Sequence, residues 1–235
     1  MFSIIIPIYN ESENIESLIK EIYHSLKKKN YNKYEIILVD DFSEDNTNTI
    51  LSKLEKIYEI KIIKNFSNQG QSFSIHKGIL EASHNTIVTL DGDGQNNPKD
   101  MPSLIDKYFS DEKIYLVGGI RYKRKDSLIK VFSSKLANFV RSSIFDDGCK
   151  DTGCSLKIFD RDVFLNFPFF NGIHRFLPSL FKGYGYDTFF INVDHRPRTK
   201  GKSKYGTFDR LYRGIFDIIK VKKIIKRNLK KHEYN

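Results

Sequence analysis

Short apolar runs alternate with longer amphipathic stretches through the first half of the chain, and this alternation restricts the fold more than any other feature. The apolar runs are rich in β-branched residues and are predicted strands: Phe2–Ile8, Tyr34–Asp40, Glu59–Lys64, Thr86–Asp91 and Lys113–Gly118. The stretches between them are predicted helices: Ser12–Lys28, Glu44–Ile57, Gly70–Ser83 and Pro98–Phe109. Such alternation predicts an α/β fold with a Rossmann-like, mostly parallel sheet flanked by helices.

Polar residues gather where three of these predicted strands end. Tyr9-Asn10-Glu11 follows the first strand, Asp40-Asp41 closes the second, and Asp91-Gly92-Asp93 closes the fourth. Ligands of open parallel sheets bind beyond the carboxyl ends of the strands. We therefore expect these groups to share one rim of the sheet and to form the binding site.

Three polar residues mark the predicted starts of helices. Asn10 with Glu13 resembles a capping box, Ser43 is placed to cap the second helix, and Asn97 before Pro98 fits an N-cap followed by the first helical position. The second half of the chain is less regular. Its predicted elements are helices at Leu128–Ile144 and Arg175–Lys182, strands at Cys154–Phe159 and Asp187–Val193, and a basic loop from Gly201 to Gly206.

The last segment, residues 207–235, is predicted to be an amphipathic helix or tail. Between Thr207 and Lys231, apolar residues recur at helical spacing and basic residues fill many of the other positions. Residues 195–235 hold 14 Lys and Arg against three acidic residues, a net +11, so the first 194 residues carry −1. This asymmetry implies an anionic partner, and the pattern suits a helix in the headgroup layer of a membrane. The alternative is a helix packed on the domain with a solvated basic face.

Several features bear on the cellular location. No stretch approaches the roughly 18 to 20 apolar residues that cross a bilayer. The apolar run at the N-terminus ends at Pro7 and lacks a basic leader, so it is predicted to be a strand and not a signal peptide. Cys149 and Cys154 do not suggest a disulfide framework. We expect a cytoplasmic protein, peripheral at the cytoplasmic face of the membrane.

Asp91-Gly92-Asp93 is the candidate metal site. Two carboxylates two residues apart, with glycines between and after them, offer hard oxygen ligands to Mg²⁺ or Mn²⁺. Gln95 can add an amide oxygen or contact a metal-bound water. An Asp/Gly turn that closes a strand would have the same sequence. An EF-hand, a P-loop and a dinucleotide-binding fingerprint are excluded, because residues that they require at fixed positions are missing.

Further motifs accompany this one in a fixed order, and together they resemble family 2 glycosyltransferases, specifically the dolichol-phosphate mannosyltransferase-like branch of polyprenyl-phosphate glycosyltransferases. The resemblance covers about residues 2–206 and rests on these segments: Pro7-Ile8-Tyr9-Asn10-Glu11, Val39-Asp40-Asp41-Phe42-Ser43, Asn68-Gln69-Gly70, Asp91-Gly92-Asp93-Gly94-Gln95, Arg121-Tyr122, Asp151-Thr152-Gly153-Cys154 and Arg198-Thr199-Lys200-Gly201-Lys202-Ser203-Lys204-Tyr205. It implies a glycosyltransferase-A type fold, with residues 1–206 as the catalytic domain. It also implies inverting transfer of one sugar from a GDP- or UDP-linked donor to dolichyl or undecaprenyl phosphate.

The resemblance further implies roles for individual residues. The base and ribose of the donor would be bound by Pro7, Tyr9, Glu11, Val39 and Asp41. The metal and the donor diphosphate would be held by Asp91, Asp93 and Gln95. Phosphates of the donor or the lipid would be met by Arg121, Arg175, Arg198 and Lys204, which suits their guanidinium and ammonium groups. A helix cap remains the alternative for Asp41, and a solvated basic loop for Arg198 and Lys204.

Three residues are the catalytic candidates: Asp93, Arg121 and Asp151. Asp151 is assigned a substrate-orienting or weak-base role, with a structural turn as an equal alternative. A sugar hydroxyl acceptor needs a general base, because its proton must leave. A phosphate acceptor is already anionic, so positioning and charge stabilisation suffice. The absence of tryptophan from the chain excludes the Q/R-x-x-R-W element of processive relatives and is consistent with a lipid phosphate acceptor.

Other functions stay open on the sequence alone. One is a glycosyltransferase that acts on a hydroxyl of a surface polysaccharide or glycolipid. Another is a basic nucleic-acid-binding module, suggested by the pI near 9.3 but disfavoured by the near-neutral globule. A donor-binding protein without activity is a third. The partners expected are a nucleotide sugar, a polyprenyl phosphate, an anionic membrane surface and, as an option, a membrane protein; no nucleic acid is expected.

Overall fold

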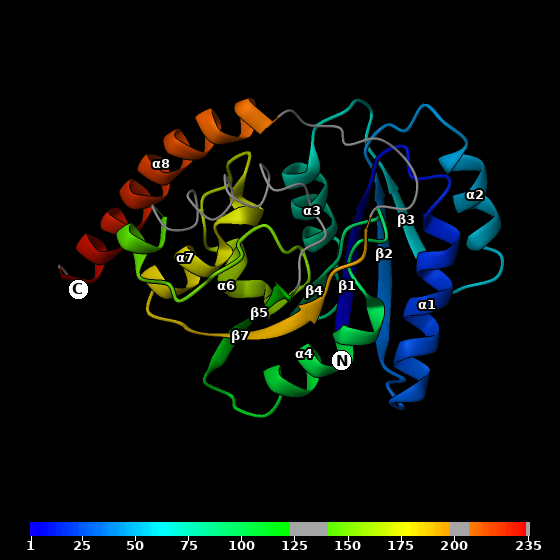
Figure 1. Cartoon of the computed structure of the whole chain (residues 1–235), viewed down its shortest axis with the longest axis horizontal. Helices are drawn as coiled ribbons and strands as arrows, with labels where there is room; N and C mark the ends of the chain where they lie inside the picture. Colours follow the sequence, from blue (N-terminus) through cyan, green and yellow to red (C-terminus); the bar gives the residue numbers. More distant parts are fainter. Residues whose placement is uncertain (123–140, 198–206, 234–235) are drawn as a thin grey trace.

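Seven strands form one sheet in the computed structural model, which describes residues 1–122, 141–197 and 207–233 (Figure 1). The strand order is β3-β2-β1-β4-β6-β5-β7. β6 is antiparallel to both of its neighbours, and the other adjacent strands are parallel. The predicted α/β class with a mostly parallel sheet is confirmed. The strands are β1 (Phe2–Ile8), β2 (Tyr34–Asp40), β3 (Ile60–Lys64), β4 (Thr86–Thr89), β5 (Ile114–Tyr122), β6 (Lys157–Asp160) and β7 (Asp187–Asp194).

Helices cover both faces of this sheet and enclose two apolar cores. One core joins the sheet to α1, α2 and α4, and the other joins it to α3, α6 and α7. Neighbouring residues of β1 serve different cores, since Ile4 and Ile6 lie in the first and Ile5 in the second. The helices are α1 (Ile15–Lys28), α2 (Thr47–Leu54), α3 (Gln71–Leu80), η1 (Pro98–Asp100), α4 (Met101–Tyr108), α6 (Arg161–Leu165), η2 (Ile173–Arg175), α7 (Leu177–Gly183) and α8 (Thr207–Glu233).

Two of the three predicted helix starts are wrong, because their residues join two loops instead. Asn10 has a left-handed backbone (φ 52°), and its side-chain oxygen accepts a hydrogen bond from the Glu44 N–H at 2.8 Å. The Ser43 hydroxyl accepts one from the Asn10 N–H at 2.8 Å. These bonds hold the loops after β1 and β2 together, and α1 and α2 begin later than predicted. Asn97 does cap η1, since its side chain accepts the Lys99 N–H at 3.2 Å.

Element boundaries shift where the sequence carries no sharp stop signal. β4 ends at Thr89, so Asp91 lies just beyond the sheet, and β5 continues to Tyr122. The strand predicted at Cys154–Phe159 is β6, displaced toward the C-terminus. The helix predicted at Arg175–Lys182 divides into η2 and α7, and α7 begins with Leu177 and Pro178 in its first turn.

Two predicted segments fall wholly or largely outside the described residues. The loop from Gly201 to Gly206 lies entirely outside them. Of the helix predicted at Leu128–Ile144, residues 141–144 are described and are helical. Both cysteines are buried and form no disulfide, as predicted. The short helix α6 was not predicted from the sequence.

The C-terminal helix α8 lies beside α7 and uses part of its apolar stripe to pack on the domain (Figure 1). Val221 is fully buried, and Ile225 packs on Gly183, where a Cβ would lie 2.5 Å from the isoleucine side chain. Asp217 pairs with Arg175 of η2 at 2.8 Å. Within the described part of the chain, no helix is long and apolar enough to cross a membrane.

Close packing of α3 on β1 and β2 depends on Gly78. A Cβ there would lie 2.6 Å from Ile5 Cγ2 and 3.0 Å from Val39 Cγ2, and both of these side chains are fully buried. We predict that Gly78→Ala lowers the free energy of unfolding by about 1–3 kcal/mol in a urea titration, although alanine favours helices. Gly214→Ala in α8 is the control, because no atom lies within 4 Å of its Cβ position, and it should stabilise by up to about 1 kcal/mol. Equal effects at the two glycines would contradict this packing argument.

Candidate active site

The loop that carries Asp91 and Asp93 sits directly against the end of β1. A Cβ on Gly92 would lie 3.1 Å from the Pro7 carbonyl oxygen and 3.6 Å from Glu11 Cγ, so a side chain there would press on the backbone of β1. The Asp93 carboxylate accepts the Gln95 N–H at 3.0 Å, which closes the turn. The groups predicted to share a rim after β1 and β4 are therefore neighbours.

Asp91 is the electrostatically unusual residue of this loop. Burial raises the pKa of its carboxyl group to about 6, and the neighbouring Asp93 carboxylate adds to the increase. The effect is opposed by a hydrogen bond from the Ser155 hydroxyl and by the positive charges of Lys157 and Arg121. Gln71, the first residue of α3, donates its amide to Asp91 Oδ1 at 2.6 Å. Asp91 thus lies close to a second acidic group in a setting that penalises the charge of Asp91.

Lys157 is a member of this site that the sequence analysis missed. It is buried in β6 opposite Thr89 of β4, and its ammonium donates to the carbonyl oxygens of Cys154 and Thr152. Its charge lowers the pKa of Asp91. A lysine at the start of β6, directly before Ile158 and Phe159, is the signal that could have found it, because lysines are almost never fully buried without partners.

Arg121 and Asp151 form a two-pronged ion pair at the end of β5. Arg121 Nε lies 2.6 Å from Asp151 Oδ2, its Nη2 lies 2.8 Å from Oδ1, and its backbone N–H donates to Oδ2 at 3.2 Å. Asp151 is buried. Gly153 allows this approach, since a Cβ there would lie 2.8 Å from Arg121 Nη2. Both carboxylate oxygens of Asp151 therefore fix the orientation of the guanidinium.

A second ion pair anchors the loop that leads to Asp151. Arg141 and Asp147 are both buried and pair with each other, and the Ser179 hydroxyl of α7 donates to the same carboxylate. Arg141 also donates to the Cys149 carbonyl. Asp147 accepts the Cys149 N–H at 3.0 Å. The segment before Asp151 is thus tied to α7, far along the chain.

The residues predicted to bind the base and ribose do not all present side chains at the rim. Asp41 is buried, and its carboxylate accepts hydrogen bonds from the Gln69 N–H at 2.9 Å and the Gly70 N–H at 2.8 Å, so it holds the loop before α3. Glu11 is buried and accepts from the Asn14 amide at 2.8 Å. The Val39 side chain lies fully inside the second core. Partly exposed positions at the rim are Pro7 and Tyr9.

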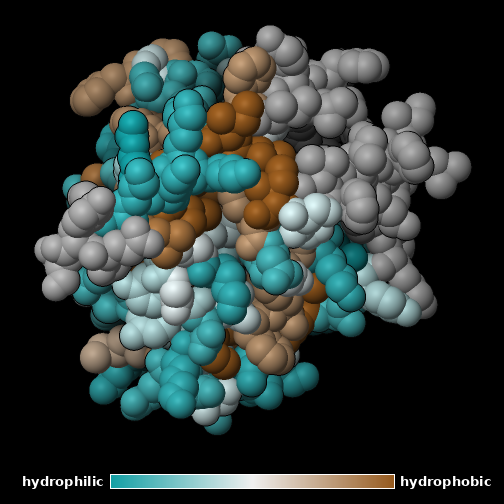
Figure 2. Space-filling view, turned by 90° about the vertical axis from the view of Figure 1, so that its left-hand side faces the viewer, coloured by the Kyte–Doolittle hydropathy of each residue, from teal (hydrophilic) through white to brown (hydrophobic). Residues whose placement is uncertain are grey.

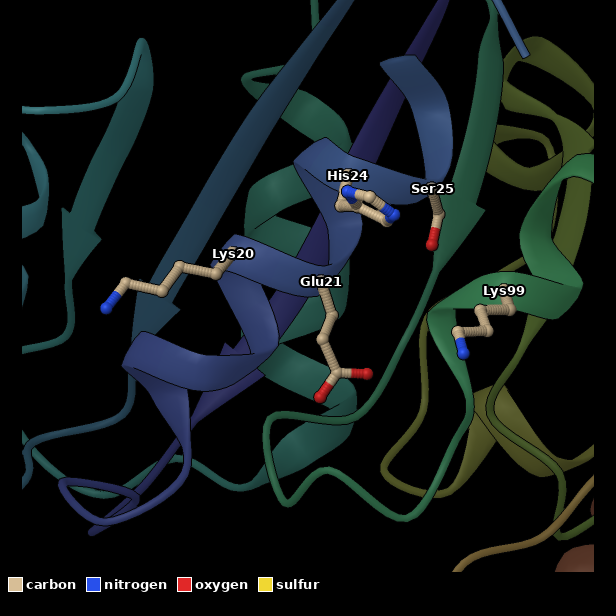
Figure 3. A pocket seen from close by; sticks show the side chains of 5 residues that line it. All are labelled: Lys20, Glu21, His24, Ser25 and Lys99. Atoms are coloured by element: carbon tan, nitrogen blue, oxygen red, sulfur yellow. The ribbon is translucent and has the colours of Figure 1, made fainter. Parts of the chain in front are cut away.

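Gln95 connects the acidic loop to the segment after β7. Its side-chain amide donates to the Arg196 carbonyl at 3.4 Å, and the Arg196 N–H donates to the Gln95 carbonyl at 3.0 Å. The Arg196 guanidinium lies 2.7 Å from Glu21 of α1 and 2.6 Å from Asn97 Oδ1. Glu21 also lines a shallow hollow of about 330 Å³ between α1 and η1 (Figure 3). That hollow contains none of the predicted site residues; it is lined by Lys20, Glu21, His24, Ser25 and Lys99.

Two of the four predicted phosphate-binding residues, Arg121 and Arg175, lie within the described residues. Arg121 lies near Asp91, close enough for its charge to affect the carboxyl group. Arg175 instead pairs with Asp217 of α8. Arg198 and Lys204 lie outside the described residues.

Comparison with known proteins decides the family. The family model "Glycosyl transferase family 2" matches residues 3–166, which include β1, the acidic loop and Asp151. The chain belongs to glycosyl transferase family 2. The expected family resemblance is confirmed.

Similar family 2 sequences include two that act on polyprenyl phosphates by name. The dodecaprenyl-phosphate galacturonate synthase of Rhizobium johnstonii is 33% identical over 224 residues, which are 93% of this chain and 65% of that protein. The undecaprenyl-phosphate 4-deoxy-4-formamido-L-arabinose transferase of Yersinia pestis is 33% identical over 219 residues, 92% of this chain and 66% of that protein. The chain thus spans just under two thirds of the length of these relatives.

Solved structures confirm the fold. The glucosyl-3-phosphoglycerate synthase of Mycobacterium tuberculosis, in complex with Mn²⁺ and UDP-glucose, superposes with a TM-score of 0.72 at 17% identity and covers 93% of this chain and 77% of that one. Its complex with Mn²⁺, UDP and glucosyl-3-phosphoglycerate gives a TM-score of 0.70 at 18% identity, with 94% and 78% covered. This likeness establishes the glycosyltransferase-A type architecture.

The acidic loop of this family 2 chain fits a divalent cation. The raised pKa of Asp91, caused by burial and by Asp93, means that a bound cation would relieve an existing penalty. No group of three His, Cys, Asp or Glu side chains suited to a metal occurs among the described residues. Two carboxylates would therefore leave most of the coordination to other oxygen atoms, which suits Mg²⁺ or Mn²⁺ together with substrate phosphates and water.

The raised pKa of Asp91 gives a prediction about the stability of the protein. Because the folded-state pKa of Asp91 lies above its unfolded value of about 4, the wild-type protein loses stability relative to Asp91→Asn as pH rises from about 4 to about 6. In EDTA, Asp91→Asn should therefore be more stable by about 1–2 kcal/mol at pH 7.5 and nearly equal to wild type at about pH 3, below the unfolded pKa. Denaturant titrations at both pH values measure this. With Mn²⁺ and nucleoside diphosphate present, the order should reverse, because only wild type retains the full ligand set. A variant less stable at pH 7.5 in EDTA would contradict the argument.

Proposed function

We propose that this protein transfers one sugar from a nucleoside-diphosphate sugar to a polyprenyl phosphate, with inversion at the anomeric carbon and with Mg²⁺ or Mn²⁺. The observation that carries the proposal is the pairing of opposite charges at one rim: the Asp91–Asp93 pair suits a cation, and Arg121 beside it suits phosphate oxygens. The acceptor class is supported by the names of the two relatives, both of which are 33% identical to this chain.

The reaction is a direct displacement. An oxygen of the lipid phosphate forms a bond to the anomeric carbon while the bond from that carbon to the donor phosphate breaks, and the nucleoside diphosphate leaves with the electron pair. A metal held by Asp91 and Asp93, with Gln95 at the loop's end, would offset the charge of the leaving diphosphate. Arg121 would bind phosphate oxygens, and the Asp151 carboxylate holds its guanidinium in place.

The geometry of Asp151 favours a positioning role over a general-base role. Both of its oxygens contact Arg121, at 2.6 Å and 2.8 Å, and the side chain is buried. An anionic phosphate acceptor carries no proton that must be removed before attack. A buried carboxylate committed to an arginine is compatible with such an acceptor. The alternative acceptor, a sugar hydroxyl, would need a base elsewhere.

The proposed function includes attachment to the membrane through α8. The outward face of α8 is rich in basic residues, and the exposed ones among the described side chains are Lys220, Lys222, Lys223, Lys226, Arg227 and Lys230. Each basic residue near an anionic leaflet adds about 1 kcal/mol of attraction. We propose that residues 207–235 hold the catalytic domain, residues 1–206, at the cytoplasmic face, with Arg198 and Lys204 near the lipid phosphate. A membrane-protein partner would act at the same face.

A transfer assay tests the proposed reaction. Purified protein, Mn²⁺ or Mg²⁺, undecaprenyl phosphate and each of a panel of labelled GDP- and UDP-sugars are incubated, and the lipid is extracted. We expect label in the lipid with one donor, and Asp93→Asn should reduce the rate at least about 100-fold, since charge stabilisation of this kind contributes several kcal/mol.

Asp187→Asn is the matched control for that assay. Asp187 is exposed at the start of β7, at the opposite end of the parallel strands, so its substitution should leave the rate unchanged. Label that enters water-soluble oligosaccharides, but never the lipid, would support a hydroxyl acceptor instead. Label in neither product with any donor would refute the proposal.

The role of Asp151 gives a separate prediction. Asp151→Asn weakens the two-pronged ion pair that orients Arg121. We therefore expect kcat/KM for the lipid phosphate to fall about 10- to 100-fold, which corresponds to a weakened charge-assisted hydrogen bond. The shape of the pH–rate profile should stay that of wild type, because no proton is removed. Arg121→Lys should give a similar loss, since lysine cannot form the two-pronged ion pair. An acidic limb that disappears in Asp151→Asn alone would instead identify Asp151 as a general base.

A further inference from the structure

Three phenylalanines near the rim have exposed side chains. The exposed fractions are 97% for Phe66, in the loop after β3, 36% for Phe73 of α3, and 44% for Phe169, between α6 and η2. The rings of Phe73 and Phe169 meet edge to face with centroids 6.4 Å apart. The Lys77 ammonium lies 5.9 Å from the centroid of Phe66. We call these three residues the aromatic patch.

The chain segments that carry the aromatic patch also contact the acidic loop and α8. Gln71, two residues before Phe73, donates to Asp91 at 2.6 Å. Phe170 follows Phe169 in the chain, and the Lys220 ammonium of α8 lies 5.3 Å from the Phe170 centroid. The backbone beside the patch is therefore joined to the proposed sugar-transfer site through Gln71 and to the basic helix through Phe170.

α8 itself combines exposed apolar side chains with basic ones. Phe216, Ile219 and Leu229 are 56%, 49% and 54% exposed on a helix whose outward positions are mainly Lys and Arg. The molecule seen from the side of α7 and α8 presents a hydrophobic area bordered by hydrophilic side chains (Figure 2). Aromatic and aliphatic side chains among lysines match the boundary layer of a bilayer, where apolar groups insert and ammonium groups meet lipid phosphates.

We propose that the aromatic patch inserts into an anionic bilayer and, with the outward face of α8, orients the rim toward the lipid headgroups. This inference rests on the proposed function, because a lipid acceptor requires the rim to face the membrane. The basic residues of α8 supply the long-range attraction. The aromatic patch supplies the orientation, since it lies at the end of α3 that contacts Asp91.

The chain contains no tryptophan, so a single introduced tryptophan reports its own environment. Phe66→Trp and Phe73→Trp are compared with Phe109→Trp, a matched control that is 54% exposed at the end of α4, away from the rim. Each full-length variant is mixed with vesicles of phosphatidylglycerol and phosphatidylcholine, or of phosphatidylcholine alone. With the anionic vesicles, we expect the tryptophan fluorescence at positions 66 and 73 to shift to the blue and to be quenched by brominated lipid. Neither change should occur at position 109.

Other outcomes would overturn the inference. Pelleting with vesicles without a shift at positions 66 and 73 would mean that α8 binds alone. Equal shifts at all three positions would mean unoriented adsorption. No binding to anionic vesicles would exclude the bilayer as the occupant and leave a protein surface as the remaining class.

A second measurement separates this inference from the proposed reaction. Phe66→Ser changes a side chain that is 97% exposed, so its fold should be unaffected. Its transfer rate to a short, water-soluble polyprenyl phosphate should equal that of wild type, and its rate with undecaprenyl phosphate in vesicles should fall about 10-fold, as expected for losing one large inserted side chain. Equal transfer rates of Phe66→Ser and wild type in vesicles would overturn the membrane inference but not the proposed function. A blue shift of the tryptophan emission at positions 66 and 73, without sugar transfer to either acceptor, would overturn the proposed function but not the membrane inference.

Discussion

Burial of the Asp91 carboxylate beside Asp93 is the constraint on which the candidate site depends. Burial and the charge of Asp93 together raise the pKa of Asp91, and Lys157, Arg121 and the Ser155 hydroxyl offset only part of the cost. The fold tolerates the pair because the surrounding sheet is apolar on both faces and supplies the stability elsewhere. A site that is costly when empty of a cation is also one that gains most when a cation and a diphosphate enter.

The parts of the fold that follow from local periodicity were predictable. Strand–helix alternation predicts the sheet class, and the rule that ligands bind at the carboxyl ends of parallel strands predicts Tyr9, Asp41 and Asp91 on one rim. Asn10 and Ser43 resisted prediction because each bonds to the other's loop across more than thirty residues. A capping motif describes a single turn of chain, and contacts between two loops lie outside its scope.

The site was predicted less completely than the fold, for a related reason. Motif order identified Asp91, Asp93, Arg121 and Asp151, but it could not say which of them contact one another. Only the antiparallel insertion of β6 between β4 and β5 brings Lys157 opposite Thr89, and that strand order leaves no periodic trace in the sequence. Val39 illustrates the opposite case: it belongs to a family motif, yet its side chain completes the core beneath the rim.

The tail shows how one amphipathic pattern can serve two surfaces. The sequence left open whether the apolar stripe of residues 207–235 meets a membrane or the domain. In the structure, Val221 and Ile225 face the domain, while Phe216 and Ile219 lie among outward lysines. Packing therefore fixes the direction in which the basic face points, and the Arg175–Asp217 pair holds α8 to η2, which follows the aromatic patch residue Phe169. Because these contacts fix which face of α8 points outward, the charge on α8 bears on how the rim is oriented toward an anionic surface as well as on how strongly the protein binds it.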